Sequence, residues 1–174
     1  PRTVRQLHAE LGIATLDDLE VALQDGRIRQ VRGMGARKQE AMLKAIAEAQ
    51  GSITIEAYIY WAGDIGRRFA DALAARAKAG VCVKILLDAV GSSTIGDEIL
   101  EVLEKGKCQL GWYNPARPYS IGRLNHRTHR KSLIIDGRVA FTGGAGIADH
   151  WMGCAQDDQH WRDIQIRIEG PAVM

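Results

Sequence analysis

A histidine and a lysine stand two residues apart at His129 and Lys131, followed by Asp136 and by a glycine pair at Gly143 and Gly144. On an extended strand, side chains two positions apart point to the same face, so the imidazole and the ammonium are expected to converge. A neutral imidazole can attack phosphorus, and a lysine can neutralise nonbridging oxygens as negative charge builds in the transition state. The pattern therefore predicts a displacement reaction at a phosphodiester.

The segment around this pair is basic. Residues 105–135 contain no Asp or Glu, and their cations are Lys105, Lys107, Arg117, Arg123, Arg127, Arg130 and Lys131. A locally positive region suits a phosphate group, whereas the formal net charge of the whole chain, +2, is too small to indicate a partner. A solvated basic loop is the alternative interpretation of this cluster.

Alternating strands and helices are expected to position the pair. Apolar patterning predicts strands over 52–61, 81–87 and 108–113, and amphipathic helices between them over 64–79 and 98–104. This alternation predicts an α/β fold with parallel strands at its centre. The first strand is expected to be buried on both faces, and one of these faces carries Ile53, Ile55, Ala57, Ile59 and Trp61.

A hairpin is expected directly after the lysine. Residues 131–135 and 139–141 flank Asp136 and Gly137, a dipeptide that predicts a two-residue hairpin between antiparallel strands. An antiparallel pair is therefore expected to extend the parallel part of the sheet.

The first 50 residues read differently, as short helices with tight connections. Apolar residues recur there at helical spacing, interrupted by Gly12, Gly26 and the Gly33-Met34-Gly35 run, and Thr15 is expected to cap the helix that starts at Leu16. The sequence thus predicts a small all-α module over residues 1–50 and an α/β unit over residues 51–174.

The pattern HxKxxxxD at residues 129–136, followed by the glycine pair, resembles the signature of the phospholipase D superfamily. The similarity extends over about residues 51–174, because several segments resemble the first half of bacterial cardiolipin synthase-like members: 66–73, 86–92, 161–163 and 167–173. This resemblance implies a phospholipase D-like mixed sheet flanked by helices. It also implies a ping-pong mechanism through a phosphohistidine, which requires neither a metal nor a cofactor.

The resemblance implies a role for each residue of the pattern. His129 is the nucleophile or its general-acid counterpart, Lys131 and the glycine pair bind phosphate, and Asp136 is mainly architectural. Asp163 is the candidate carboxylate that orients the histidine and stabilises its cation. The alternative for Asp163 is an ion pair at a strand end with a neighbouring arginine.

A full site in this superfamily needs two such histidines, one to attack and one to protonate the leaving oxygen. This chain contains a single HxK pattern of the required spacing, so we expect an isolated monomer to be nearly inactive. Either a homodimer or a missing C-terminal half would complete the site. Both ends of the sequence look cut, and we expect the chain to be a fragment or a fusion.

A second resemblance covers most of residues 1–50. Residues 31–38 have the hGhG form of a helix-hairpin-helix, and residues 3–13 and 26–28 are similar to the tandem hairpins of bacterial family X DNA polymerases. The resemblance implies sequence-independent binding of duplex DNA phosphate through Gly33, Gly35, Arg37 and Lys38. A helical pair that merely packs through a glycine turn is the alternative.

Two classes of function therefore compete. The favoured class is a phosphodiesterase or phosphatidyltransferase acting on a phospholipid, and the other is a DNA-binding protein or dimeric nuclease. The three cysteines, at 82, 108 and 154, lack CxxC spacing, which argues against a zinc site and a disulfide framework. No apolar run approaches the roughly 20 residues that span a bilayer, so we expect a protein in the cytoplasm or peripheral to the inner membrane.

Overall fold

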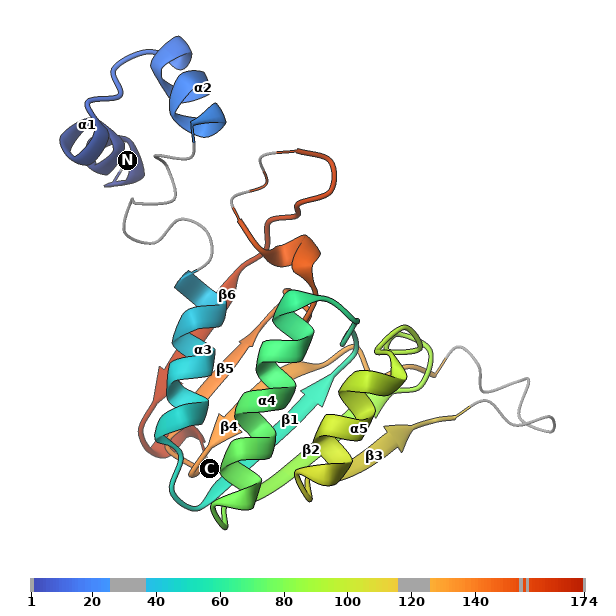
Figure 1. The fold of residues 1–174 in the computed structure, drawn as a ribbon. Coiled ribbons are helices and arrows are strands. Elements are labelled where there is room, and N and C mark those ends of the chain that lie inside the picture. The colour runs from blue at the N-terminus through green and yellow to red at the C-terminus, as the bar shows by residue number, and fades with distance from the viewer. Residues whose placement is uncertain (1, 26–36, 116–125, 154, 156, 174) are drawn as a thin grey trace.

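Figure 1 shows the fold in a computed structural model of the chain, which describes residues 2–25, 37–115, 126–153, 155 and 157–173. A six-stranded mixed sheet with the order β3-β2-β1-β4-β5-β6 forms its centre. The strands are β1 (Ser52–Ala57), β2 (Cys82–Asp88), β3 (Gln109–Tyr113), β4 (Lys131–Ile135), β5 (Val139–Gly143) and β6 (Gln165–Glu169). The pairs β1–β2 and β2–β3 are parallel, whereas β4, β5 and β6 each run antiparallel to the preceding strand of the sheet order. The predicted α/β fold, with a parallel part and an antiparallel extension, is confirmed.

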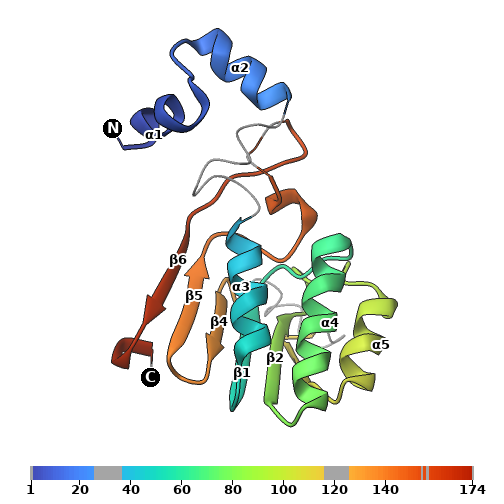
Figure 2. The same cartoon turned by 60° about the vertical axis from the view of Figure 1, so that its left-hand side comes forward.

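Three helices lie on one face of this sheet (Figures 1 and 2): α3 (Arg37–Glu48), α4 (Asp64–Lys78) and α5 (Asp97–Lys105). Phe69 and Leu73 of α4 are fully buried against the strands. Ile46 and Ala49, in and just after α3, belong to the same core. The core beneath the helices therefore includes part of the segment that the sequence assigned to the N-terminal module.

The expectation that the first strand is buried on both faces is wrong. Ile53 and Ile55 point into the core, but Thr54 between them is exposed, together with its cross-strand neighbour Lys84 and with Gln109, which pairs with Lys84. The strand also ends at Ala57. Beyond it Tyr60 is fully buried, whereas Ile59 and Trp61, which were predicted to share the inward face, are half-buried. The backbone leaves the ladder there, so the alternation of faces does not continue.

The hairpin between β4 and β5 forms where the sequence predicts it. Asp136 and Gly137 have positive φ angles of 53° and 60°, and the N–H of Arg138 donates to the carbonyl of Ile135 at 3.0 Å. Because Ile135 pairs with Val139, the connection is three residues long, and the predicted length of two residues is wrong. Two short 3-10 helices follow, η3 (Asp149–Trp151) after β5 and η4 (Pro171–Val173) after β6.

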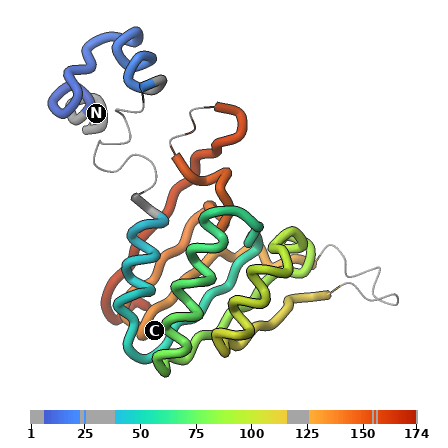
Figure 3. Tube along the Cα trace, viewed as in Figure 1, coloured from blue at the N-terminus to red at the C-terminus, as the bar shows by residue number. Residues whose placement is uncertain are grey.

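The N-terminal helices α1 (Arg2–Leu11) and α2 (Leu16–Gln24) form a separate small unit, drawn in blue in Figure 3. Ile13 and Ala22 are buried between them. The predicted cap at Thr15 is confirmed, because its hydroxyl accepts the Asp18 N–H at 3.1 Å while Asp18 accepts the Thr15 N–H at 2.9 Å. The hairpin glycines Gly33 and Gly35 lie outside the described residues.

Candidate active site

The predicted catalytic residues, with one exception, meet at a single edge of the sheet. β1, β2 and β5 end at this edge, whereas β4 and β6 begin there, since Ala57 pairs with Lys131 and Gly143 pairs with Gln165. His129 lies just before β4, and Asp163 lies just before β6. Tertiary folding thus brings the histidine, the lysine, the glycine pair and Asp163 to the same edge.

His129 and Lys131 converge as the spacing predicts. Lys131 Nζ lies 3.4 Å from His129 Nδ1 and donates a hydrogen bond to the His129 carbonyl at 3.2 Å. The ring of Tyr58, directly after β1, packs on the His129 ring with centroids 4.6 Å apart, and the Lys131 ammonium lies 5.3 Å from the centre of the Tyr58 ring. His129 itself remains exposed, so its imidazole is accessible to a substrate.

Lys131 is partly desolvated in the folded chain. Desolvation by burial lowers its pKa from the usual range, and the negative charge of Asp163 partly opposes this shift. An ammonium that has lost part of its water gains more from a phosphate oxygen than a fully hydrated one does. Asp163 is therefore close enough to act electrostatically on this site.

The glycine pair is required by close packing of β5 against the chain before β6. A β carbon on Gly143 would overlap the Ile164 carbonyl, and one on Gly144 would overlap the Asp163 carboxylate. The N–H of Gly144 already donates to the Ile164 carbonyl at 3.1 Å. The structure thus gives both glycines a steric role, and their binding of phosphate stays a prediction.

Asp136 is the exception, since it lies at the opposite end of β4. Seven positions of extended chain separate it from His129, or roughly 23 Å at about 3.3 Å per residue. Its carboxylate accepts backbone N–H groups of Gln50, Gly51 and Ser52 at 2.9, 2.7 and 2.8 Å. Desolvation by burial would raise the pKa of Asp136, but these hydrogen bonds and the charge of Arg138 outweigh it and hold the pKa below its usual value. Asp136 ties the β4–β5 hairpin to the start of β1.

Most described members of the basic cluster already have carboxylate partners. Arg127 pairs with the buried Asp88, Arg130 pairs with Glu56, and Lys105 pairs with Glu101. Arg117 and Arg123 lie outside the described residues. The cluster is therefore neither simply a solvated loop nor wholly available to phosphate, because tertiary ion pairs occupy part of it.

Sequence reasoning missed three residues that contact the histidine or its neighbours in the chain: Tyr58, Asp88 and Glu56. The signal for Asp88 was a single acid at the end of the apolar run 85–87, where burial demands a partner. The partners of all three residues are remote in sequence, and no local pattern indicates them.

Of the predicted DNA-binding residues, Arg37 and Lys38 begin α3, while Gly33 and Gly35 lie outside the described residues. Within the described ranges, no group of three or more His, Cys, Asp or Glu residues is arranged to hold a metal ion. In those same ranges no helix combines the length and the apolar character needed to cross a bilayer.

A mixed sheet with a histidine and a lysine at one edge, near a carboxylate, defines a phospholipase D-like unit. The sequence matches the model of one protein family, described as "Cardiolipin synthase, PLD-like domain", over residues 42–159. The chain therefore belongs to the cardiolipin synthase-like family of phospholipase D domains.

Related sequences support the same assignment. The chain is 35% identical over 133 residues to cardiolipin synthase 1 of Bacillus cereus, and 36% identical over 141 residues to the major cardiolipin synthase of Bacillus subtilis. These alignments cover 76% and 80% of this chain but only 26% and 29% of the two relatives. The chain thus spans less than a third of the length of these curated relatives.

Solved structures share the fold. Nuc of Salmonella typhimurium, a phospholipase D family member, superposes with a TM-score of 0.54 at 22% identity, covering 78% of both chains. Phosphatidylserine synthase of Haemophilus influenzae has a TM-score of 0.59 at 17% identity, covering 78% of this chain and 32% of its own. At these identities the similarity concerns the fold alone.

Proposed function

We propose that this chain is one half of a phosphatidyltransferase or phosphodiesterase site in which His129 is the nucleophile. The observation that carries the proposal is the approach of the Lys131 ammonium to within 3.4 Å of the His129 imidazole at an accessible sheet edge. A phosphoryl group held by Lys131 would thus lie beside the attacking ring.

The chemistry has two steps. A ring nitrogen of neutral His129 forms a bond to phosphorus while the bond from phosphorus to the leaving oxygen breaks, and that oxygen takes the electron pair and a proton. An alcohol or water then forms a bond to phosphorus while the bond from phosphorus to the His129 nitrogen breaks, and it gives its proton to the group that protonated the leaving oxygen. Lys131 stabilises the charge on the nonbridging oxygens in both steps, and Asp163 stabilises the cationic ring.

A phospholipid is the favoured substrate. Cardiolipin synthases are the relatives named above, and apolar side chains flank Asp163 in this structure. Trp161 is 43% exposed and Ile164 is 71% exposed. Such side chains suit the acyl and interfacial region around a lipid headgroup better than the charged backbone of DNA. The protein is accordingly expected in the cytoplasm or peripheral to the inner membrane.

The leaving oxygen needs a proton donor that a second HxK pattern would supply. Two sources are open: the same pattern in a second copy of the chain, or another segment that contributes the rest of the site. A homodimer would place two copies of His129 across a two-fold axis.

A substrate that needs no proton donor tests this half-site directly. Bis(p-nitrophenyl) phosphate releases p-nitrophenolate, a stable anion, so the first step can proceed with one histidine. We expect a burst of one p-nitrophenolate per chain and a p-nitrophenylphosphoryl group on His129 by mass spectrometry. Treatment with EDTA should leave the burst unchanged.

Two variants complete the experiment. His129→Ala should lose the burst by about 10³-fold or more, whereas His126→Ala, which removes an exposed histidine three positions earlier, should retain it. An undiminished burst in His129→Ala would disprove the role of His129. Sedimentation of the same samples reports whether turnover beyond the burst follows dimer formation.

A further inference from the structure

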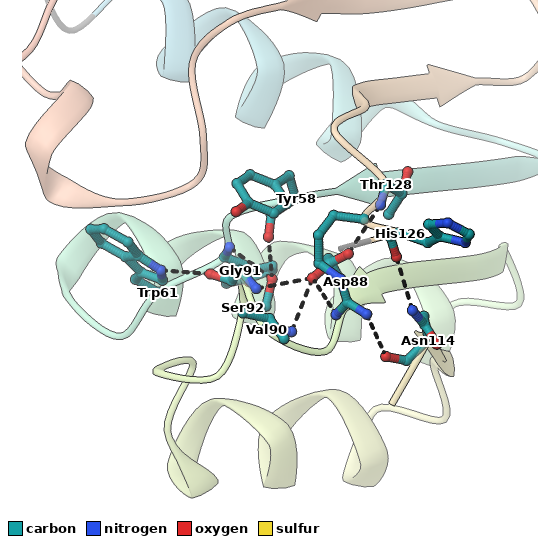
Figure 4. Close-up of polar contacts among 11 residues, drawn as sticks. Tyr58, Trp61, Asp88, Val90, Gly91, Ser92, Asn114, His126 and Thr128 are labelled. Carbon is teal, nitrogen blue, oxygen red and sulfur yellow. Dashed lines mark hydrogen bonds and ion pairs between the residues drawn. The ribbon is translucent and has the colours of Figure 1, made fainter. Parts of the chain in front are cut away.

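Asp88 is a fully buried carboxylate that the chemistry above does not use. It ends β2, and Figure 4 shows Val90, Gly91 and Thr128 beside it. Its Oδ1 accepts the N–H groups of Val90 and Gly91 at 2.9 and 3.0 Å, which closes the turn formed by residues 88–92. We refer to residues 88–92 as the Asp88 turn.

The remaining contacts of Asp88 reach the chain just before the histidine. Arg127 Nη1 lies 3.3 Å from Oδ1, and the Thr128 N–H donates to Oδ2 at 3.0 Å. The side chain of Arg127 is only 12% exposed. A buried charge is retained only where partners compensate it, so this pair holds residues 127–128 firmly against β2.

A second carboxylate binds the residues on both sides of His129. Glu56 of β1 accepts the Thr128 hydroxyl at 2.8 Å and the Arg130 guanidinium at 3.4 Å. The Thr128 contact holds the chain before His129, and the Tyr58 N–H, which donates to the Arg130 carbonyl at 3.0 Å, holds the main chain after it.

The Asp88 turn also supports the ring beside the histidine. The Ser92 hydroxyl donates to the Tyr58 carbonyl at 3.0 Å and accepts the Tyr60 N–H at 3.1 Å. A β carbon on Gly91 would overlap the Tyr58 carbonyl and crowd its ring, so the turn packs directly on Tyr58. Tyr58 in turn packs on His129.

We propose that the Asp88 turn is a positioning element that sets the His129 imidazole, through Thr128 on one side and Tyr58 on the other, before a phosphodiester binds. Asp88 and Ser92 are positioning residues and touch no substrate. The catalytic consequence rests on the proposed function, whereas the position of the ring does not. A displacement of about 1 Å at a reacting group can lower a rate by roughly 10²-fold.

The experiment compares Asp88→Asn with Asp71→Asn. The control removes the same charge from an exposed ion pair with Arg67 on α4, remote from the histidine in the fold. In Asp88→Asn we expect the nuclear Overhauser effect between the His129 and Tyr58 rings to weaken, and exchange of the Thr128 amide to accelerate by about tenfold or more. The burst rate constant should fall by roughly 10²-fold with little change in the half-saturating ester concentration. Asp71→Asn should match wild type in all of these.

Further variants keep the test decisive. Ser92→Ala should weaken the ring contact while leaving Thr128 exchange unchanged, and Arg127→Lys should recover part of what Arg127→Met loses. These variants replace Asp88→Asn if its circular dichroism shows that it does not fold. An unchanged ring contact and burst rate in folded variants would overturn the proposal. A wild-type chain without any burst would instead refute the proposed function, and the ring and exchange measurements would still decide the positioning role.

Discussion

The two ends of β4 carry parts of one sequence pattern and use them differently. At the start of the strand, His129 and Lys131 lie at an accessible edge with Asp163 nearby. At its other end, the Asp136 carboxylate accepts hydrogen bonds from the three backbone N–H groups of residues 50–52. A carboxylate with these hydrogen bonds has little capacity left to bind a substrate. An exposed imidazole and a partly desolvated ammonium retain that capacity.

This difference separates two requirements of the site. The start of β4 is expected to determine the rate of phosphoryl transfer, and the end of β4 is expected to determine how firmly the hairpin holds β1. Substitutions at the two ends should therefore affect different measurements.

The largest effect after His129→Ala is expected at the other residue of the catalytic end. Lys131→Met removes the charge that stabilises the transferring phosphoryl group, so the burst rate constant should fall by about 10²- to 10³-fold without loss of folding stability. Lys84→Met, on the exposed face of β2, is the matched control and should react like wild type. A wild-type burst rate constant in Lys131→Met would show that the lysine does not stabilise the transferring phosphoryl group.

At the opposite end, Asp136→Asn should destabilise the fold and spare the chemistry. Loss of charge-assisted hydrogen bonds at a half-buried site is expected to lower the free energy of unfolding by about 1–2 kcal/mol, with the burst rate within a few-fold of wild type. Urea unfolding measures the first and the chromogenic ester the second. If Asp136→Asn lost as much burst rate as Lys131→Met, the two ends of β4 would not have the separate catalytic and structural roles expected here.

The acid stability of the wild type sharpens the same point. The pKa of Asp136 is lower in the folded chain than in the unfolded chain, so its contribution is complete above the unfolded value of about 4 and is lost as pH falls through the folded value. Between pH 5 and 2, roughly, Asp136→Asn should show a smaller decline of unfolding free energy than wild type. An equal decline in both proteins would show that other groups cause the acid sensitivity.

A smaller effect is expected from Asp163→Asn. The charge of Asp163 raises the pKa of Lys131 against the desolvation that lowers it. The burst rate constant is expected to decline at high pH as Lys131 loses its proton. Removing the charge of Asp163 should shift this alkaline limb of the pH profile to lower pH, because Lys131 then loses its proton at a lower pH. Asp158→Asn, an exposed acid five positions earlier, should leave the limb in place. A limb that stayed in place in Asp163→Asn would show that Asp163 does not act on Lys131.

The smallest effect concerns duplex DNA. Arg37 and Lys38 begin α3, whose other end leads to the β1 start that Asp136 holds, so this helix starts toward the catalytic edge. If residues 31–38 bind DNA phosphate, Arg37→Glu with Lys38→Glu should weaken a low-affinity, salt-sensitive interaction several-fold in fluorescence anisotropy. Equal binding by both proteins would remove duplex DNA as a candidate partner of residues 31–38.

Sequence reasoning succeeded where the signal is local. Helical spacing, the Thr15 cap, the Asp136-Gly137 hairpin and the convergence of His129 with Lys131 all depend on residues within a few positions of one another. It failed for the first strand, because solvent exposure of Thr54 depends on which layers cover the sheet rather than on the strand itself.

The sequence by itself therefore determined the kinds of elements and the reacting pair. Only the tertiary structure decided which groups surround that pair. Asp88 meets Thr128 across 40 positions, and Asp136 meets Gly51 across 85. Such partners are chosen by strand order and by the demand of buried charges for compensation, and periodicity along the chain does not report either of these.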